Sequence, residues 1–529
     1  DIAARNIQGL RDIARFTPGF SFENFTGPLA APIIRGQTQT RVDLPVQNVA
    51  SFFNGVYLQR GYMIDASLLD VERVEVIKGP QSALYGRNAF SGAINYISKK
   101  PGDRLEASAS ATVGSDERRE LKGSISGPLA DWLGVSLAIG TSEFDGTWKN
   151  NHPLAAQGTG TRDNVGGHEN EAALVGLTIR PLDGLTFDAA FSWSNLDVEH
   201  QPAYTVSVPG LLSTVNTLNC SPLPGLNATT GAPVGAPQNR LFCGELRPQP
   251  TLVGSELSGP LARPAGVVID PRAYSQRGTS RLGSFKATWD VTEQISLNYL
   301  GGWTDTNVQS RGSPARNSLV SAVVQPPFFA PGVPNPFFPI NGFTGFDAQP
   351  NGGFTSRSHE LRVEWRPGGL VRRAMLGGFV SRARDDLSQW SAWGPPNSLA
   401  EPSQFFTLGN NTRRDDVSSY FGLVTLDVTP QLSVTGEVRY TKEELTLQVR
   451  TSSVVPVPTA FNASAPIVRV QEADFDYTTP RVAVDYKLTD QNLLYVSGGK
   501  GVKSGGQNVP GRDPLQDIYD PEENWTIEL

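Results

Sequence analysis

Histidine is scarce in this sequence of 529 residues: four occur, at positions 152, 168, 200 and 359. They are scattered among expected loops and strand ends, so neither a Ser-His-Asp set nor a metal site follows from their spacing. The segment HELRV at 359–363 begins like a zinc-protease helix but lacks its second histidine. The stretch GGKGVKSGG at 498–506 likewise departs from the phosphate-loop pattern. The sequence therefore predicts no enzyme, no cofactor and no metal site.

Charged residues and long apolar runs are also in short supply. Charged residues make up 18% of the chain, below a usual share of about 25%. The net charge of −7 gives no indication of a nucleic-acid groove. No run of about 18 apolar residues occurs, so no membrane-spanning helix is predicted. The 54 glycines and 40 prolines are dispersed, which is typical of many strands separated by turns.

The only two cysteines are Cys220 and Cys243, and both lie in one long polar, proline-rich segment. A pair this close in sequence predicts a local disulfide and an oxidising compartment. Closing a loop of this size stabilises the chain by roughly 3 kcal/mol in the chain-entropy model. The alternative is two unpaired thiols.

The first hundred residues predict a compact α+β domain. A helical spacing of apolar residues over 7–16 ends at a Thr-Pro-Gly sequence. Asn54-Gly55 predicts a hairpin turn between two short strands. The other expected elements are a strand ending at 35–36, a strand at 71–77, a turn at 79–80, a helical turn at 83–85 and a strand at 93–98.

From residue 104 onward, apolar and polar residues alternate. In LTFDAAFSWS (185–194), Leu185, Phe187 and Phe191 share one side, and polar residues occupy most of the other. A period of two predicts strands with one apolar and one polar face. Such strands suit either a soluble sandwich, with its apolar faces buried together, or a membrane barrel, with its apolar faces turned to lipid.

Three features favour the barrel. The strands are about ten residues or longer, as a tilted membrane strand requires. Aromatic residues lie near strand ends, as in interfacial girdles: Trp193, Trp289, Trp303, Tyr440, Tyr486 and Tyr495. Short turns (DVTEQI, DVTPQL, KLTDQN and RPLDGL) alternate with long loops expected at 144–169, 197–277, 308–354, 385–412 and 447–473. This alternation is typical of outer-membrane barrels.

The segment VERVEVIKGPQSALYGRNAFSGAINYISKK (71–100) resembles the plug signature of TonB-dependent outer-membrane receptors. Further matches are IRG at 34–36, FFNGVYL at 52–58, TPRVAVDYKL at 479–488, LYVSGGKGVKSGGQN at 494–508 and YDPEENWTIEL at 519–529. The resemblance implies a mainly β protein, a large antiparallel transmembrane β-barrel with an N-terminal α+β plug in its lumen. The expected domains are a plug at 1–101 and a barrel at 102–529.

The family's TonB box would lie upstream of the plug and is not in this sequence. The sequence gives about thirteen strands and the start of a fourteenth, whereas plugged transporters have about 22 strands. We therefore expect a fragment that lacks the TonB box and the C-terminal barrel strands.

The matching motifs nominate site residues. The plug signature residues are Arg35, Gly36, Asn54, Gly55, Arg73, Glu75, Gly79, Pro80, Tyr85, Gly86 and Gly92. In this family, plug arginines and barrel glutamates pair in the lumen, which nominates Arg35 and Arg73 with Glu360 and Glu437 as partners. Alternation places Glu437 on the polar face of its strand, and Glu360 opposite Leu361 and Val363. Arg73 and Glu75 are expected to bond to the polar barrel wall.

The resemblance implies a receptor in the outer membrane of a Gram-negative bacterium, working as a monomer in outer-membrane lipid. It would bind a scarce nutrient and import it with energy delivered by TonB and its partners ExbB and ExbD. The resemblance implies a ferric siderophore as the first expected cargo, because such complexes are the family's commonest. Few histidines and two methionines disfavour haem and copper. Aromatic loop residues could contact the ligand or merely pack their own loops: Phe328, Phe329, Phe337, Phe338, Trp390 and Trp393.

Other functions are compatible with the same barrel. The cargo could be cobalamin or an oligosaccharide, and the barrel could instead be a passive pore or an adhesin. A porin would lack the plug, so residues 1–101 argue against the passive pore. A receptor that also signals would carry an additional upstream domain.

Overall fold

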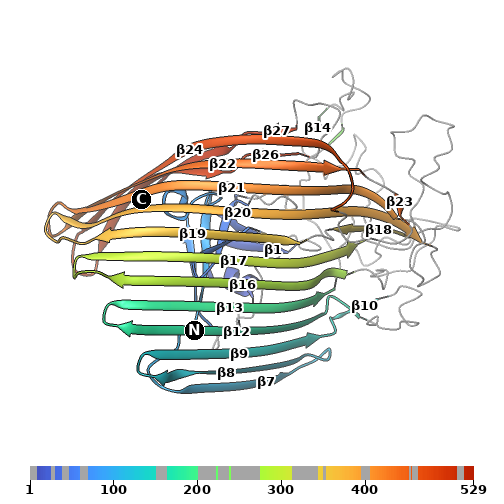
Figure 1. Ribbon diagram of the computed structural model, residues 1–529, viewed down its shortest axis with the longest axis horizontal. Coiled ribbons are helices and arrows are strands. Elements are labelled where there is room, and N and C mark those ends of the chain that lie inside the picture. Colours follow the sequence, from blue (N-terminus) through green and yellow to red (C-terminus); the bar gives the residue numbers. More distant parts are fainter. Residues whose placement is uncertain are drawn as a thin grey trace.

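The computed structural model describes residues 9–24, 30–37, 47–59, 69–150, 164–199, 222–223, 238–239, 274–312, 344–349, 353–394, 405–451, 454–455, 463–508 and 517–529. Within these ranges, a small N-terminal domain lies against one face of a large curved sheet (Figure 1). Neither helix in the described ranges is long and apolar enough to cross a membrane.

The N-terminal elements occur in the predicted order. They are α1 (Leu10–Phe16), β1 (Phe20–Asn24), β2 (Ala30–Ile34), β3 (Val49–Phe53), β4 (Val56–Leu58), β5 (Val71–Lys78), α2 (Ser82–Tyr85) and β6 (Gly92–Ser98). Strands β3 and β4 join across Asn54-Gly55, where both residues have positive φ, so the predicted hairpin is confirmed.

The N-terminal domain is built on a four-stranded sheet of order β4-β3-β6-β5, in which β3 and β6 are parallel. The apolar residues of α1 and the β1–β2 hairpin cover this sheet. Leu10, Ile34, Val49 and Ile94 are fully buried in the resulting core. Burial of these side chains supplies the main stabilising term of the small domain.

Sixteen strands of the described chain form the large antiparallel sheet. Two of them, β18 (Thr344–Gln349) and β23 (Val454–Val455), are short, which leaves fourteen, as predicted. The fourteen are β7 (Glu106–Val113), β8 (Arg119–Ala130), β9 (Leu133–Phe144), β12 (His168–Leu182), β13 (Leu185–Val198), β16 (Tyr274–Asp290), β17 (Ile295–Gly312), β19 (Phe354–Trp365), β20 (Val371–Gly394), β21 (Phe405–Asp427), β22 (Leu432–Arg450), β24 (Ile467–Lys487), β25 (Leu493–Lys503) and β28 (Glu522–Glu528).

Each long strand pairs with the next one along the chain, from β7 at one edge to β28 at the other. The described β7 and β28 do not pair with each other, so the sheet is curved but open. Short two-stranded pairs lie beside it: β10 (Trp148–Lys149) with β11 (Asn164–Val165), β14 (Pro222–Leu223) with β15 (Gln238–Asn239), and β26 (Gly506–Gln507) with β27 (Ile518–Tyr519).

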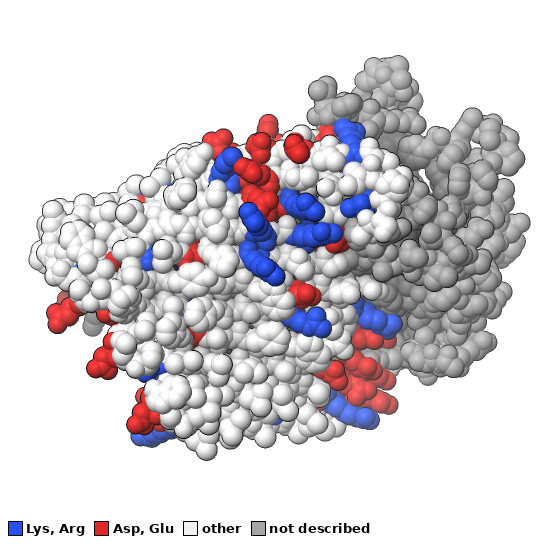
Figure 2. Space-filling model, viewed as in Figure 1, with Lys and Arg blue, Asp and Glu red and all other residues white. Residues whose placement is uncertain are grey.

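The outward face of the large sheet is apolar. Tyr420 on β21 and Val438 on β22 are 72% and 49% exposed, whereas their polar neighbours Ser419 and Arg439 are buried. Figure 2 shows a broad, largely uncharged surface, with a few charged side chains, mostly acidic, at one end and mixed charges nearer the other end. Large apolar side chains outside and polar ones inside are the arrangement of a membrane barrel and not of a soluble sandwich.

The two ends of the barrel differ as the sequence predicted. Short turns join β12 to β13, β16 to β17, β21 to β22 and β24 to β25 at one end, which we name the short-turn end (Figure 1, left). At the other end β13 stops at Val198 and β16 begins at Tyr274. The expected loop bounds 385–412 and 447–473 were wrong, because β20 to β24 stay paired beyond them. For example, Asp386 on β20 accepts hydrogen bonds from Arg384 and Thr412 within this extension.

Candidate functional site: the interface between plug and barrel

Arg87 anchors the N-terminal domain, the plug, to the barrel. It follows directly after α2 and Gly86, whose φ of 88° turns the chain toward the wall. The Arg87 side chain is buried, with Nη2 3.3 Å from Oδ2 of Asp415 on β21 and Nη1 4.0 Å from Oε2 of Glu443 on β22. Two barrel carboxylates therefore share one plug guanidinium.

Glu443 is fully buried and uses both carboxylate oxygens. The Tyr477 hydroxyl on β24 donates to Oε1 over 2.6 Å, and the Ser504 hydroxyl donates to Oε2. On the plug side, Asn88 donates to the Tyr57 hydroxyl over 2.8 Å and accepts from the Ser504 amide over 3.1 Å. A buried charge needs such a partnered environment, because burial removes the hydration that it has in bulk solvent.

We name Arg87, Tyr57, Asp415, Glu443, Tyr477 and Ser504 the Arg87 cluster. Burial alone would lower the pKa of Arg87, but the nearby carboxylates of Glu443 and Asp415 outweigh it and raise this pKa. Burial also raises the pKa of Tyr57 above its ordinary value. The guanidinium of Arg87 therefore stays charged and the phenol of Tyr57 stays neutral at physiological pH.

Arg35 makes a second contact between plug and barrel. Its positive φ of 54° ends the β1–β2 hairpin, and its guanidinium lies 2.5 Å from Oε1 of Glu528 on β28. The Tyr495 hydroxyl donates to the same oxygen over 3.1 Å. Arg35 and Glu528 are both partly exposed, so this ion pair is screened more strongly than the Arg87 cluster.

The tip of the β3–β4 hairpin reaches the wall at β16. The Asn54 side-chain amide donates to Ser98 over 2.9 Å and to Ser284 on β16 over 3.3 Å. The Gly55 amide donates to the Asn95 side chain over 3.1 Å. The hairpin tip is therefore tied to β6 of the plug and, through one neutral hydrogen bond, to the barrel.

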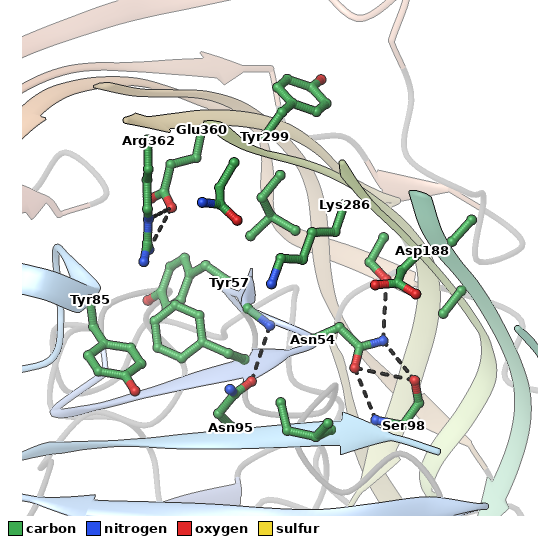
Figure 3. A pocket seen from close by; sticks show the side chains of 18 of the residues that line it. Asn54, Tyr57, Tyr85, Asn95, Ser98, Asp188, Lys286, Tyr299, Glu360 and Arg362 are labelled. Atoms are coloured by element: carbon green, nitrogen blue, oxygen red, sulfur yellow. Dashed lines mark hydrogen bonds and ion pairs between the residues drawn. The ribbon is translucent and has the colours of Figure 1, made fainter. Parts of the chain in front are cut away.

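A cavity of about 610 Å³ separates the plug from the wall beside this hairpin (Figure 3). Plug residues on one side include Asn54, Tyr57 and Tyr85, and barrel residues on the other include Lys286 and Glu360. The barrel residues come from β12 to β22, near the short-turn end of several of these strands. Polar plug and barrel side chains therefore face each other across open space here.

The glutamates expected to pair with plug arginines pair with barrel arginines instead. Glu360 and Glu437 both point inward as predicted, but each pairs along the barrel wall: Glu360 with Arg362 over 2.6 Å, and Glu437 with Arg481 over 2.8 Å. Neither glutamate pairs with Arg35 or Arg73. The reason is local: each has an arginine within reach on the same inward face, on its own strand or the next one.

Arg73 and Glu75 also differ from the expectation of wall contacts. Arg73 is half-exposed and pairs with Glu75 and Glu72, each over 2.8 Å. Glu75 accepts a further hydrogen bond from Asn95 over 3.1 Å. These charges satisfy one another on the surface of β5, so they do not hold the plug to the barrel.

The glycines of the plug signature occupy positions that exclude a side chain. Gly79 and Gly86 have φ values of 92° and 88°, and a Cβ at Gly92 would lie 2.4 Å from the Ile77 carbonyl oxygen. A Cβ at Gly86 would lie 3.1 Å from the guanidinium carbon of Arg439. Pro80 follows Gly79 in the turn before α2, and Tyr85 is the last residue of α2. Gly36 has a φ of 73°.

The remaining predicted site residues cannot be placed. Phe328, Phe329, Phe337, Phe338, Cys220 and Cys243 lie outside the described residues. Trp390 and Trp393 lie on β20 by their backbone, but their side chains fall outside the described part. The disulfide and the ligand loops therefore stay predictions. Within the described ranges no cluster of three or more histidine, cysteine or carboxylate side chains could hold a metal ion.

The sequence reasoning missed Arg87 and Glu443, although signals for both were present. Arg87 stands directly after Tyr85-Gly86 in the plug signature. Glu443 lies an even number of residues after Glu437 and Arg439, so it is on the same inward face of β22. Continuing the alternation along this strand would have found it.

This architecture, a small α+β domain held by buried ion pairs against the polar face of a membrane barrel, defines a plugged outer-membrane receptor. Residues 1–93 match the family model described as TonB-dependent Receptor Plug Domain. Residues 247–529, more than half of the chain, match the model TonB dependent receptor-like, beta-barrel. The chain belongs to the TonB-dependent receptor family, which is a family of transport receptors.

Individual relatives match over parts of the chain. The pesticin receptor of Yersinia pestis is 29% identical over 174 residues, which is 32% of this chain and 24% of the relative. The vitamin B12 transporter BtuB of Photobacterium profundum is 26% identical over 166 residues, 31% of this chain and 27% of the relative. These matches thus span about a quarter of each relative's length.

Solved structures match over nearly the whole chain. The ferric yersiniabactin uptake receptor FyuA from Yersinia pestis has a TM-score of 0.66 at 18% identity, covering 99% of this chain and 66% of that structure. The siderophore receptor PiuA from Acinetobacter baumannii has a TM-score of 0.66 at 15% identity, covering 99% and 67%. The chain spans about two thirds of these structures, and at such identities the likeness establishes the fold.

Proposed function

We propose that this protein is an outer-membrane receptor of a Gram-negative bacterium that binds a scarce nutrient and imports it with energy delivered by TonB, ExbB and ExbD. The observation that carries the proposal is the plug, held in the barrel by the Arg87 cluster. A barrel occupied by a tethered domain has to be opened for each transport event, whereas an empty barrel conducts passively. Membership of the TonB-dependent receptor family supports TonB as the source of that work.

We propose a ferric siderophore as the cargo. The structures that share this fold include receptors named for ferric yersiniabactin, ferric preacinetobactin and ferric catecholates. Cobalamin is the second candidate, because the vitamin B12 transporter BtuB is among the relatives by sequence. The cargo would be bound from the long-loop side and released at the short-turn end, which faces the periplasm in barrels of this type.

The domain division belongs to the same proposal. Strand β6 ends at Ser98 and β7 begins at Glu106, so we place the end of the plug at residue 101 and the start of the barrel at residue 102. The aromatic loop residues and the Cys220–Cys243 bridge would shape the outer surface that first meets the cargo. We take the receptor to act as a monomer.

Uptake and binding of labelled nutrients separate active import from passive conduction. Cells expressing the full-length receptor are given labelled ferric siderophores, cobalamin and oligosaccharides, with and without TonB and with and without an uncoupler of the proton gradient. We expect surface binding of one cargo class in all conditions, and import only with TonB and an intact gradient. Import that persists without TonB would identify a passive pore instead.

A further inference from the structure

The cavity beside the plug hairpin contains more positive charge than its own carboxylates can match. Both oxygens of Asp188 on β13 already have a partner: one accepts from Lys100 of the plug over 2.5 Å, and the other from Thr178 over 2.8 Å. Asp188 lies directly opposite Lys286 in the register of β13 and β16. It is nevertheless bonded to the plug and to β12 rather than to Lys286.

The two glutamates of the wall are committed in the same way. Glu360 pairs with Arg362 over 2.6 Å. Glu364 pairs with Arg366 over 2.7 Å and with Arg373 over 2.8 Å. On the plug side of the cavity, Glu72 pairs with Arg73. Every carboxylate that lines the cavity in the described chain therefore already has a cationic partner.

Lys286 is the first cation left over. Its ammonium makes no ion pair and no hydrogen bond with any described residue, and its side chain extends into the cavity between Asn54 and Glu360 (Figure 3). The Lys286 side chain is exposed, so solvent in the cavity hydrates the ammonium in the absence of cargo.

Arg439 on β22 is the second cation of the cavity without a carboxylate partner among the described residues. It is 3% exposed and lines the same cavity, yet it forms no ion pair with a described carboxylate. Its guanidinium lies over the Phe421 ring at 4.7 Å, and Nη1 donates to the Leu84 carbonyl oxygen over 3.5 Å. Its Nε, buried from solvent, has no hydrogen-bond partner among the described residues. A buried donor without an acceptor costs free energy, so binding of an acceptor at this Nε would remove that cost.

We propose that this cavity is a transit site for an anionic group, a carboxylate or a phosphate, that the cargo carries. Lys286 and Arg439 supply the charge and the donors, and the rings of Tyr57 and Tyr85 provide an apolar wall for the rest of the molecule. The site lies on the far side of the plug hairpin from the long loops, so it acts after capture. The inference rests on the proposed import function and specifies its substrate class as an anion.

The first test measures anion binding directly. Citrate is titrated calorimetrically into the purified full-length receptor and three single variants: Lys286→Gln, Lys286→Arg and Lys442→Gln. Lys442 is the matched control, because it lies on the outer face of the barrel and is exposed. We expect Lys286→Gln to weaken citrate binding about tenfold. Lys286→Arg should keep it, because the charge and donors remain, and Lys442→Gln should leave it unchanged. Citrate affinity that is the same in the wild type and in Lys286→Gln overturns the proposal.

The second test links the site to transport and separates the two proposals. For an anionic ferric chelate imported by the wild type, Lys286→Gln should lower the import rate about tenfold at unchanged surface affinity. If the citrate difference is found but import of that chelate is unchanged, the cavity is an adventitious ion site only. If the wild type imports nothing in the panel while Lys286-dependent citrate binding remains, the proposed function fails and the anion site stands.

Discussion

Arg87 shows what a single buried residue does at the seam between plug and barrel. A buried ion pair adds little net stability, because desolvation of both partners offsets their attraction. Removing one partner is different, since the other charge is then left buried and unmatched. Arg87 faces two carboxylates, so its loss leaves the buried Glu443 without a cationic partner and Asp415 with Arg413 alone. The cluster therefore contributes more to the orientation of the plug in the barrel than to the net stability of the interface.

Replacing Arg87 by methionine should lower the free energy of unfolding by about 3–5 kcal/mol. Denaturant unfolding of the receptor in detergent, with proteolysis of the plug as a second readout, measures this loss. Adding Glu443→Gln to the variant should restore part of it, because one stranded charge is removed. Arg73→Met is the matched control: this arginine makes only surface ion pairs, worth less than about 1 kcal/mol. Equal losses in Arg87→Met and Arg73→Met would contradict the role of the cluster.

At the scale of the element, the short turns were predictable because their chemistry is local. The repeated segments DVTEQI, DVTPQL and KLTDQN each place a threonine at the same point of the turn. In each one the threonine hydroxyl oxygen accepts backbone N–H groups: Thr429 accepts from Gln431 over 3.2 Å and from Leu432 over 3.0 Å, and Thr292 and Thr489 repeat this geometry. One side chain thus accepts from two amides of the turn, and the Leu432 amide also donates to the Thr429 carbonyl oxygen over 3.2 Å.

Thr429→Val removes these hydrogen bonds and keeps the shape of the side chain. We expect it to destabilise the receptor by about 0.5–1.5 kcal/mol, the net worth of a typical hydrogen bond. The midpoint of thermal or denaturant unfolding measures the change. Thr478→Val serves as the control, since Thr478 is exposed on the outward face of β24, in the middle of the strand and away from the turns. A loss in Thr478→Val as large as in Thr429→Val would show that the turn bonds are not the cause.

At the scale of the whole molecule, the plug and the barrel were predictable from the sequence, but the ion pairs between them were not. Alternation and turn residues are read over a few neighbours, so strands, turns and the plug elements could be placed. The partner of Arg35 is Glu528, which is 493 residues away, and the partners of Arg87 come from β21 and β22. Such pairs depend on how the folded plug is rotated in the lumen. No local pattern encodes that rotation, so charged motifs indicated that a wall contact exists without indicating which residues make it.

A cross-link between α2 and β25 tests whether the plug must leave the wall. The Val502 amide donates to the Ser82 hydroxyl over 3.2 Å, so the two residues are in direct contact, and cysteines are placed at both positions to be oxidised to a disulfide. In a background with Cys220→Ser and Cys243→Ser, the oxidised Ser82→Cys/Val502→Cys receptor should bind its cargo normally. Its import rate should fall at least about tenfold, because opening the plug now requires breaking a covalent bond. A reductant should restore import, and each single-cysteine variant should transport normally under both conditions. Full import by the oxidised receptor would show instead that α2 stays on β25, and that the passage forms on the opposite side, along the cavity between the β3–β4 hairpin and the wall.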